Sequence, residues 1–156
     1  MNIVEFAKII FKSQPPSSIT VMKAERNKAF CRKGYMAIML FGRLFTRDNN
    51  VAEELNRGGV LMHHEMIHVR QAQAVFDSWL CYYMLYVYFS IRAACYFRHL
   101  RKSFYFLNPF EIEAYMYMSK RNYVSDSTRK AVRWKVIARM SLKERYELVK
   151  RCGLVR

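Results

Sequence analysis

Acidic residues are scarce in this chain. It has 12 Asp and Glu residues against 27 Lys and Arg residues, a formal net charge of +15 at pH 7. Such a charge attracts anionic partners, which are nucleic acid, an anionic lipid surface or an acidic protein. No zinc-finger, P-loop or dinucleotide-binding motif accompanies the basic residues. Nucleic acid is therefore a possible partner that no sequence motif supports. The simpler interpretation of the positive charge is a basic surface that is solvated by water.

Closely spaced cysteines are also absent. Cys31, Cys81, Cys95 and Cys152 form no C-x-x-C pair. This spacing argues against a structural zinc site and against a disulfide framework. We expect buried free thiols in a reducing compartment.

No apolar run reaches the length of a bilayer span. The run Trp79–Ile91 ends at Arg92 and begins just after Asp77, well short of the about 20 apolar residues that a span needs. We expect a core helix here, packed across the helix of the motif described below. The alternative is an interfacial helix whose flanking basic residues contact lipid phosphates. Those residues are Arg92, Arg98, Arg101 and Lys102.

The N-terminus lacks the features of a secretory signal. Residues Met1–Lys12 have no continuous apolar segment and no small-residue cleavage site. Their apolar positions instead predict an amphipathic helix. We expect a cytoplasmic protein without a signal peptide, with peripheral attachment to the inner membrane face as the alternative.

What the chain does have is the sequence H-E-M-I-H at residues 64–68. Positions i and i+4 share one face of a helix, so His64 and His68 can point at one metal ion. Glu65 lies at the edge of that face, where its carboxylate can take a proton from a water that the metal activates. Apolar neighbours predict a buried helix over Val60–Phe76. Buried polar groups need partners, and a metal ion would satisfy all three.

A catalytic zinc site needs a third protein ligand. Glu111 and Glu113 lie at the start of another expected helix, where Asn108 is typical of an N-cap and Pro109 of the first helical residue. If Glu111 closes a capping box with Asn108, Glu113 is free to be the ligand. The residues alone leave both glutamates open.

H-E-x-x-H followed by E-x-x-A on a second helix resembles the gluzincin metallopeptidases. H-E-M-I-H-V-R-Q at residues 64–71, then an aromatic-rich helix, then N-P-F-E-I-E-A-Y at residues 108–115, is similar to short bacterial proteins of that class. The resemblance covers roughly Gly58 to Met118. It implies Zn²⁺ as the cofactor, with His64, His68 and Glu111 as metal ligands and Glu65 as the general base. The larger gluzincins usually carry Asp or Asn where this chain has Tyr115, so the resemblance names no partner that orients a ligand histidine.

Other candidates for the site are weaker. His63 points about 100° away from His64 on the same helix, which favours a surface position or one that supports a ligand without binding the metal. His99 lies in a basic run and is expected to be solvated. Tyr115 or another of the 11 tyrosines is a candidate donor to a developing oxyanion, and the sequence does not choose among them.

Strand-like segments come early and helices late, which predicts an α+β fold. We expect one domain over residues 1–156, with a small N-terminal antiparallel sheet packed on a mainly helical, zincin-like core. Expected strands are Ala29–Arg32, Tyr35–Phe41 and Arg43–Thr46, with a turn at Lys33-Gly34 and a bulge or bend at Gly42. Expected helices are Ala52–Leu55, Val60–Phe76, Ser78–Phe97, Pro109–Arg121, Ser127–Met140 and Leu142–Arg151, the last with a capping box from Ser141 to Glu144. The resemblance places an edge strand, Tyr35–Phe45, beside the metal helix, where a peptide could add as a further strand.

Together these patterns predict a zinc-dependent metallohydrolase that acts as a peptidase on a peptide or protein substrate. Three alternatives stay open. The first is a catalytically inactive metal-binding protein that serves as an interaction domain. The second is a basic protein associated with nucleic acid, such as a protease that acts on DNA-bound proteins. The third is an interfacial membrane protein in which the H-E-x-x-H motif is accidental.

Overall fold

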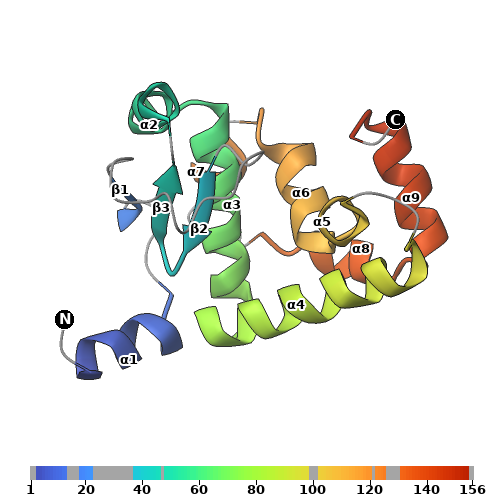
Figure 1. The fold of residues 1–156 in the computed structure, drawn as a ribbon, viewed down its shortest axis with the longest axis horizontal. Helices are drawn as coiled ribbons and strands as arrows, with labels where there is room; N and C mark the ends of the chain where they lie inside the picture. The colour runs from blue at the N-terminus through green and yellow to red at the C-terminus, as the bar shows by residue number, and fades with distance from the viewer. Residues whose placement is uncertain are drawn as a thin grey trace.

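The structure is a computed structural model. It describes residues 3–13, 18–22, 37–46, 48–98, 102–120, 122–125 and 131–154. Its elements in chain order (Figure 1) are α1 (Ile3–Phe11), β1 (Thr20–Met22), β2 (Ala37–Leu40), β3 (Arg43–Thr46), α2 (Asn49–Asn56), α3 (Val60–Ala74), α4 (Trp79–Tyr96), α5 (Ser103–Phe106), α6 (Pro109–Tyr117), α7 (Asn122–Ser125), α8 (Trp134–Arg139) and α9 (Leu142–Arg151). The α+β fold is confirmed: a small sheet lies on one side of a mainly helical body.

The sheet is mixed, so the expectation of an antiparallel sheet was wrong for one strand. Its order is β1-β3-β2, with β2 antiparallel and β1 parallel to β3. A two-residue turn at Phe41-Gly42 joins β2 to β3, and both residues have positive φ, 51° and 76°. Such a tight turn forces an antiparallel pair, whereas β1 reaches β3 through a long connection that leaves its direction free. Gly42 thus belongs to a turn rather than a bulge. The expected strand Ala29–Arg32 and its turn at Lys33-Gly34 lie outside the described residues.

The helices around the motif follow the expected boundaries closely. Ser78 caps α4 by accepting a hydrogen bond from the Cys81 amide, and Asn108 caps α6 by accepting one from the Phe110 amide. The capping box between Ser141 and Glu144 is present at α9. The expected helix Ser127–Met140 is shorter in its described part, which is α8, and residues 126–130 lie outside the described residues.

An aromatic core holds α3, α4, α6 and α8 together. Trp79 and Phe89 of α4 pack with Phe110 of α6 and Trp134 of α8, against Val69 of α3. Helix α3 runs through the middle of the molecule, from α2 at one end to α4 at the other (Figure 1). This packing sets α3 and α6 face to face, which brings the two candidate sequence motifs together. None of the described helices is long and apolar enough to cross a membrane.

Candidate metal centre

Three buried side chains converge where α3 meets α6. His64 and His68 of α3 place their Nε2 atoms 3.1 Å apart. The Glu111 carboxylate of α6 lies 3.3 Å from the His64 Nε2 through Oε2 and 3.5 Å from the His68 Nε2 through Oε1. All three residues are at most 6% exposed. Among the described residues they form a group that could hold a metal ion.

The spacing of these atoms suits zinc. Bonds of about 2.0–2.1 Å in a tetrahedral arrangement separate two ligand atoms by about 3.3 Å, close to the three distances above. Within the described part of the chain, Glu111 Oε2 accepts no hydrogen bond although it is buried. A buried carboxylate oxygen without a donor is costly, and a cation between it and the imidazoles would remove that cost. Two imidazoles and one carboxylate are a ligand set that zinc favours.

The two candidate glutamates lie in different surroundings, Glu111 beside the histidines and Glu113 in a separate hydrogen-bond network. Glu111 does not close a capping box with Asn108, because its side chain is in the group with the histidines. Glu113 points elsewhere and is fully buried. Its Oε1 accepts hydrogen bonds from the Tyr123 hydroxyl at 2.6 Å and the Arg133 amide at 2.7 Å. Its Oε2 accepts one from the side-chain amide of Gln71 at 2.7 Å.

Gln71 links Glu113 to the site. Its amide nitrogen donates to Glu113 and to the Phe110 carbonyl, at 2.7 Å and 2.9 Å, so its oxygen faces the other way. That oxygen lies 2.8 Å from Nδ1 of His68. His68 Nδ1–H is then the donor, because an amide oxygen only accepts. The lone pair of His68 is therefore on Nε2, which faces His64 and Glu111, as a metal ligand requires.

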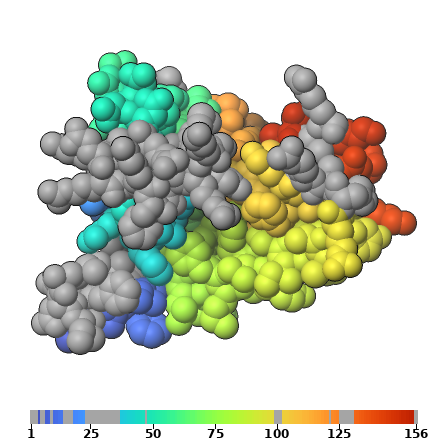
Figure 2. All heavy atoms as spheres, in the orientation of Figure 1, coloured from blue at the N-terminus to red at the C-terminus, as the bar shows by residue number. Residues whose placement is uncertain are grey.

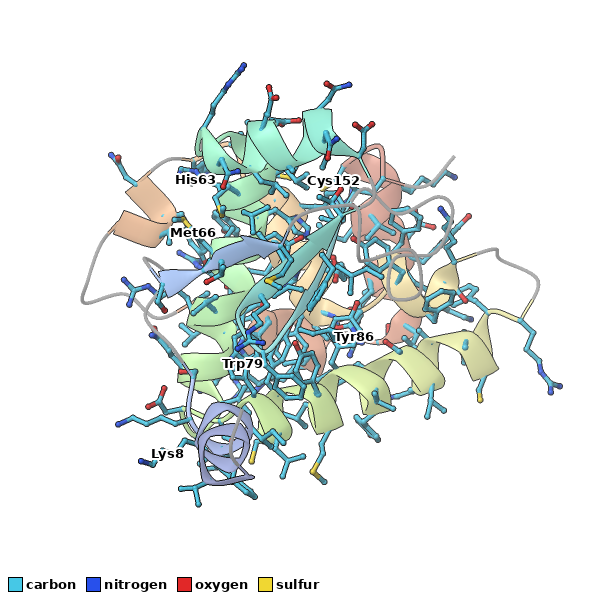
Figure 3. All side chains as sticks on the ribbon, turned by 60° about the vertical axis from the view of Figure 1, so that its left-hand side comes forward. Lys8, His63, Met66, Trp79, Tyr86 and Cys152 are labelled. Carbon is cyan, nitrogen blue, oxygen red and sulfur yellow. The ribbon has the colours of Figure 1, made fainter. Side chains whose placement is uncertain are left out.

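Tyrosines from α4 and α6 surround the group. The Tyr86 hydroxyl donates to Glu111 Oε1 at 2.8 Å, and Tyr86 points from α4 towards the interior in Figure 3. The Tyr82 hydroxyl lies 3.0 Å from His68 Nδ1. The Tyr115 ring packs on His64 with 4.6 Å between centroids, and its hydroxyl is 3.1 Å from that of Tyr105. Of the tyrosines that the sequence could not rank, Tyr86 hydrogen-bonds the Glu111 carboxylate, and Tyr105 also interacts with it.

The two acidic groups of the site are shifted in opposite directions. Burial raises the pKa of Glu65 to about 7, an effect that His68 opposes and Glu111 reinforces. Burial would also raise the pKa of Glu111, but His68, His64 and the Tyr86 hydroxyl outweigh it and lower the pKa to about 2. A pKa near neutrality is what a general base needs, since it must both take up and release a proton. Glu111, by contrast, stays ionised and can attract a cation.

A cavity of about 340 Å³ opens beside the group. His64, Glu65, His68 and Glu111 line it together with strand β2 and the aromatic side chains of α4. A second cavity of about 320 Å³ also reaches His64 and Glu65 from the side of α2 and α6. Glu65 is thus a wall of both cavities, and a molecule could approach it from either side.

The remaining sequence candidates are placed apart from the site or outside the described residues. His63 is half-buried and is not in the metal-binding group, and His99 lies outside the described residues. Cys81, Cys95 and Cys152 are free thiols, but Cys81 is only half-buried and Cys95 and Cys152 are exposed, so the expectation of buried thiols was wrong for these three. Cys31 lies outside the described residues. Cys95 lies in the last turn of α4 and Cys152 follows the end of α9.

Sequence reasoning missed Gln71, Tyr82 and Tyr86. Gln71 is three residues after His68, and that spacing places it on the same face of α3. Tyr82 and Tyr86 are four residues apart on α4 and also share a face. These spacings were visible in the sequence, but only the packing of α4 and α6 on α3 shows that these side chains meet the histidines.

Comparisons with protein-family models, curated proteins and solved structures found no match for this chain.

Proposed function

We propose that this protein is a zinc-dependent metallohydrolase, and specifically a gluzincin-like peptidase. One observation carries the proposal: Glu65, a buried carboxylate, stands beside three converging side chains that could hold a metal ion, on the wall of a cavity. His64, His68 and Glu111 would hold the metal. When bound, zinc acidifies a water molecule and polarises a carbonyl group.

The chain's own residues supply the proton chemistry and the positioning. Glu65 takes the proton of the attacking water and passes it to the leaving amine. Glu113 orients the side chain of Gln71, and the Gln71 oxygen favours the tautomer of His68 that is protonated on Nδ1. Tyr86 holds one oxygen of Glu111. The buried position of the group strengthens each of these interactions, because little bulk water surrounds the side chains.

Strand β2 supports a peptide substrate. Within the described sheet it is an edge strand, and it lines the larger of the two cavities at the site. All four residues of β2 pair in register with β3. Beside a two-residue turn, Leu40 and Ile38 take the hydrogen-bonded positions of the antiparallel pair, so the backbone groups of Ala37 and Met39 point away from β3. A peptide could add there by backbone hydrogen bonds. Tyr83 occupies the backbone groups at the turn end of β2. Its hydroxyl donates to the Met39 carbonyl and accepts from the Phe41 amide, each at 3.1 Å.

The cavity also indicates the type of side chain that fits. Apolar and aromatic residues, among them Ile38, Leu40, Trp79 and Phe104, form most of its wall. We therefore propose peptides with large apolar side chains next to the cleaved bond. Transfer of such side chains from water to the cavity provides binding energy.

The test combines metal content with hydrolysis. We expect about one zinc per chain in the purified protein and none in His64→Ala. Glu65→Gln should keep zinc and lose turnover of a mixed fluorogenic peptide library by at least about a hundredfold. Glu147→Gln is the matched control, because Glu147 is exposed on α9 and far from the site in sequence. Full activity in Glu65→Gln would refute the mechanism, and zinc without hydrolysis in any peptide pool would favour a metal-binding protein without peptidase activity.

A further inference from the structure

The outer face of α4 is apolar although it faces solvent. The inner face packs into the core through Trp79, Tyr82, Phe89 and Ala93. The opposite side exposes a row of large apolar side chains at helical spacing: Leu80, Met84, Val87, Tyr88 and Ile91. No charged residue interrupts the segment from Trp79 to Ile91. A contiguous exposed patch of this kind marks an interaction surface rather than ordinary scatter of apolar residues.

Helix α1 and the corner before α4 extend this patch. The Ser13 amide donates to the Asp77 carbonyl at 2.8 Å, and the Ser13 hydroxyl donates to the Asp77 carboxylate. These bonds fasten the end of α1 beside the start of α4, so that the two helices follow one another along the lower edge of the molecule (Figures 1 and 2). Val4 and Phe11 of α1 are exposed there too. We call this surface, formed by α1, Phe76 and the outer row of α4, the basal face.

Phe76 is the most exposed apolar side chain on the basal face. It is 89% exposed, and its backbone has a φ of +55°, followed by +54° at Asp77. Positive φ is uncommon outside glycine and costs energy for a bulky residue. The segment Phe76-Asp77 therefore exposes an aromatic ring to water in a backbone conformation that is unfavourable for a bulky residue. Burial of the ring against an external apolar phase would offset that cost.

Basic side chains border the basal face. Lys8 and Lys12 of α1 are exposed, as are Arg92 and Arg98 at the other end of α4, and Figure 3 shows Lys8 on the outer side of α1. Among the described residues, the exposed carboxylates belong to α2 and α9 and none to α4: Asp48, Glu53, Glu54, Glu144 and Glu147. The half-buried Asp77 at the corner accepts a hydrogen bond from Ser13. An apolar strip with a cationic border is the pattern that fits the acyl chains and phosphates of an anionic bilayer.

We propose that the basal face docks on the surface of an anionic phospholipid bilayer, with α4 lying in the plane of the interface. Tyr88 and the stems of Arg92 and Lys8 would sit at the boundary between acyl chains and headgroups. A second copy of this chain fits less well, because it would bring the same cationic border against itself. This inference goes beyond the proposed peptidase function and does not depend on the metal.

Vesicle binding by the full-length protein tests the proposal. We expect co-sedimentation with phosphatidylcholine vesicles that contain phosphatidylglycerol, weaker binding to phosphatidylcholine alone, and further weakening as salt is added. Val87→Glu should lower the partition coefficient about tenfold or more, because it removes apolar contact and adds a repelled charge. Arg92→Gln should lower it about fivefold on anionic vesicles.

Matched controls lie at the other end of the molecule. Val60 is 48% exposed, against 52% for Val87, and begins α3 beside α2, so Val60→Glu should bind vesicles like the unmodified protein. Arg57→Gln is the corresponding control for Arg92→Gln. The proposal is overturned if anionic vesicles do not bind the protein, or if Val87→Glu and Val60→Glu lose binding equally. It is also overturned if light scattering shows that Val87→Glu dissociates a dimer while vesicles are not bound, which would make the basal face a contact between copies.

Discussion

Replacing Gln71 by Met should weaken zinc binding although Gln71 does not touch the metal group. Met has nearly the same volume, so the packing of α3 on α6 is preserved. The change removes the acceptor of His68 Nδ1–H and the donor to Glu113 Oε2. The Tyr82 hydroxyl stays 3.0 Å from Nδ1, but a hydroxyl donates as well as accepts, so it allows the tautomer that protonates Nε2 and cannot bind a metal. Loss of such a partner weakens metal affinity about 10- to 100-fold, which corresponds to about 1.4–2.7 kcal/mol.

Stability should also fall, and by a separate mechanism. Glu113 keeps its donors Tyr123 and Arg133 on Oε1 but loses the one on Oε2, and the Phe110 carbonyl loses its donor too. Buried acceptors left without donors cost about 1–3 kcal/mol. We expect the free energy of unfolding of the metal-free protein to fall by about 2–3 kcal/mol, measured by urea denaturation in a chelator.

Tyr123→Phe separates the two effects. It removes another hydrogen bond from Glu113, but at the oxygen that does not face Gln71. We expect a loss of about 1–2 kcal/mol in stability and zinc affinity within about twofold of the unmodified protein, measured by competition with a chromophoric chelator. If Gln71→Met keeps full zinc affinity, or if both variants lose it equally, the chain from Glu113 through Gln71 to His68 does not position the ligand.

Two further predictions follow from the same geometry. Glu111→Ala should abolish tight zinc binding, while Glu113→Ala should weaken it only about 10- to 100-fold; tight zinc in both variants by chelator competition would place the third ligand elsewhere. The second concerns pH: the pKa of Glu65 is raised from 4.5 to about 7, so the folded metal-free protein binds this proton more tightly than the unfolded chain. Its contribution to stability is therefore full below pH 4.5 and is lost as pH rises to about 7, an effect of about 3 kcal/mol. Denaturation at pH 5 and pH 7.5 should show that Glu65→Gln is less sensitive to pH than the unmodified protein, and equal sensitivity would contradict the shift.

Some parts of the fold could be predicted because their causes are local. The H-E-M-I-H face, the Asn108–Pro109 helix start and the Ser141 capping box each depend on residues within one turn. β3 was predicted over its full length, Arg43–Thr46, because its residues favour a strand and a glycine precedes them, although the turn before it was expected as a bulge or bend. The direction of β1 could not be predicted, because pairing with β3 depends on a long connection rather than on neighbouring residues.

The choice between Glu111 and Glu113 shows the same limit within the site. Both are buried acids in one turn of α6, two residues apart. Helix geometry points them in directions about 200° apart, and only the way α6 packs on α3 decides which one faces the histidines. The hydrogen-bond partners of Glu113 come from residues 71, 123 and 133, which no local pattern connects.

The amino-acid sequence alone was enough to predict the residue types of the candidate metal group, the i, i+4 spacing of the histidines and the apolar character of Trp79–Ile91, because these depend on composition and helical periodicity. Tertiary structure decided which glutamate joins the histidines, that Gln71 orients His68, and which face of α4 is left uncovered. These are properties of contacts between helices, and a helix with apolar residues on all sides carries no signal of which side its neighbours will cover.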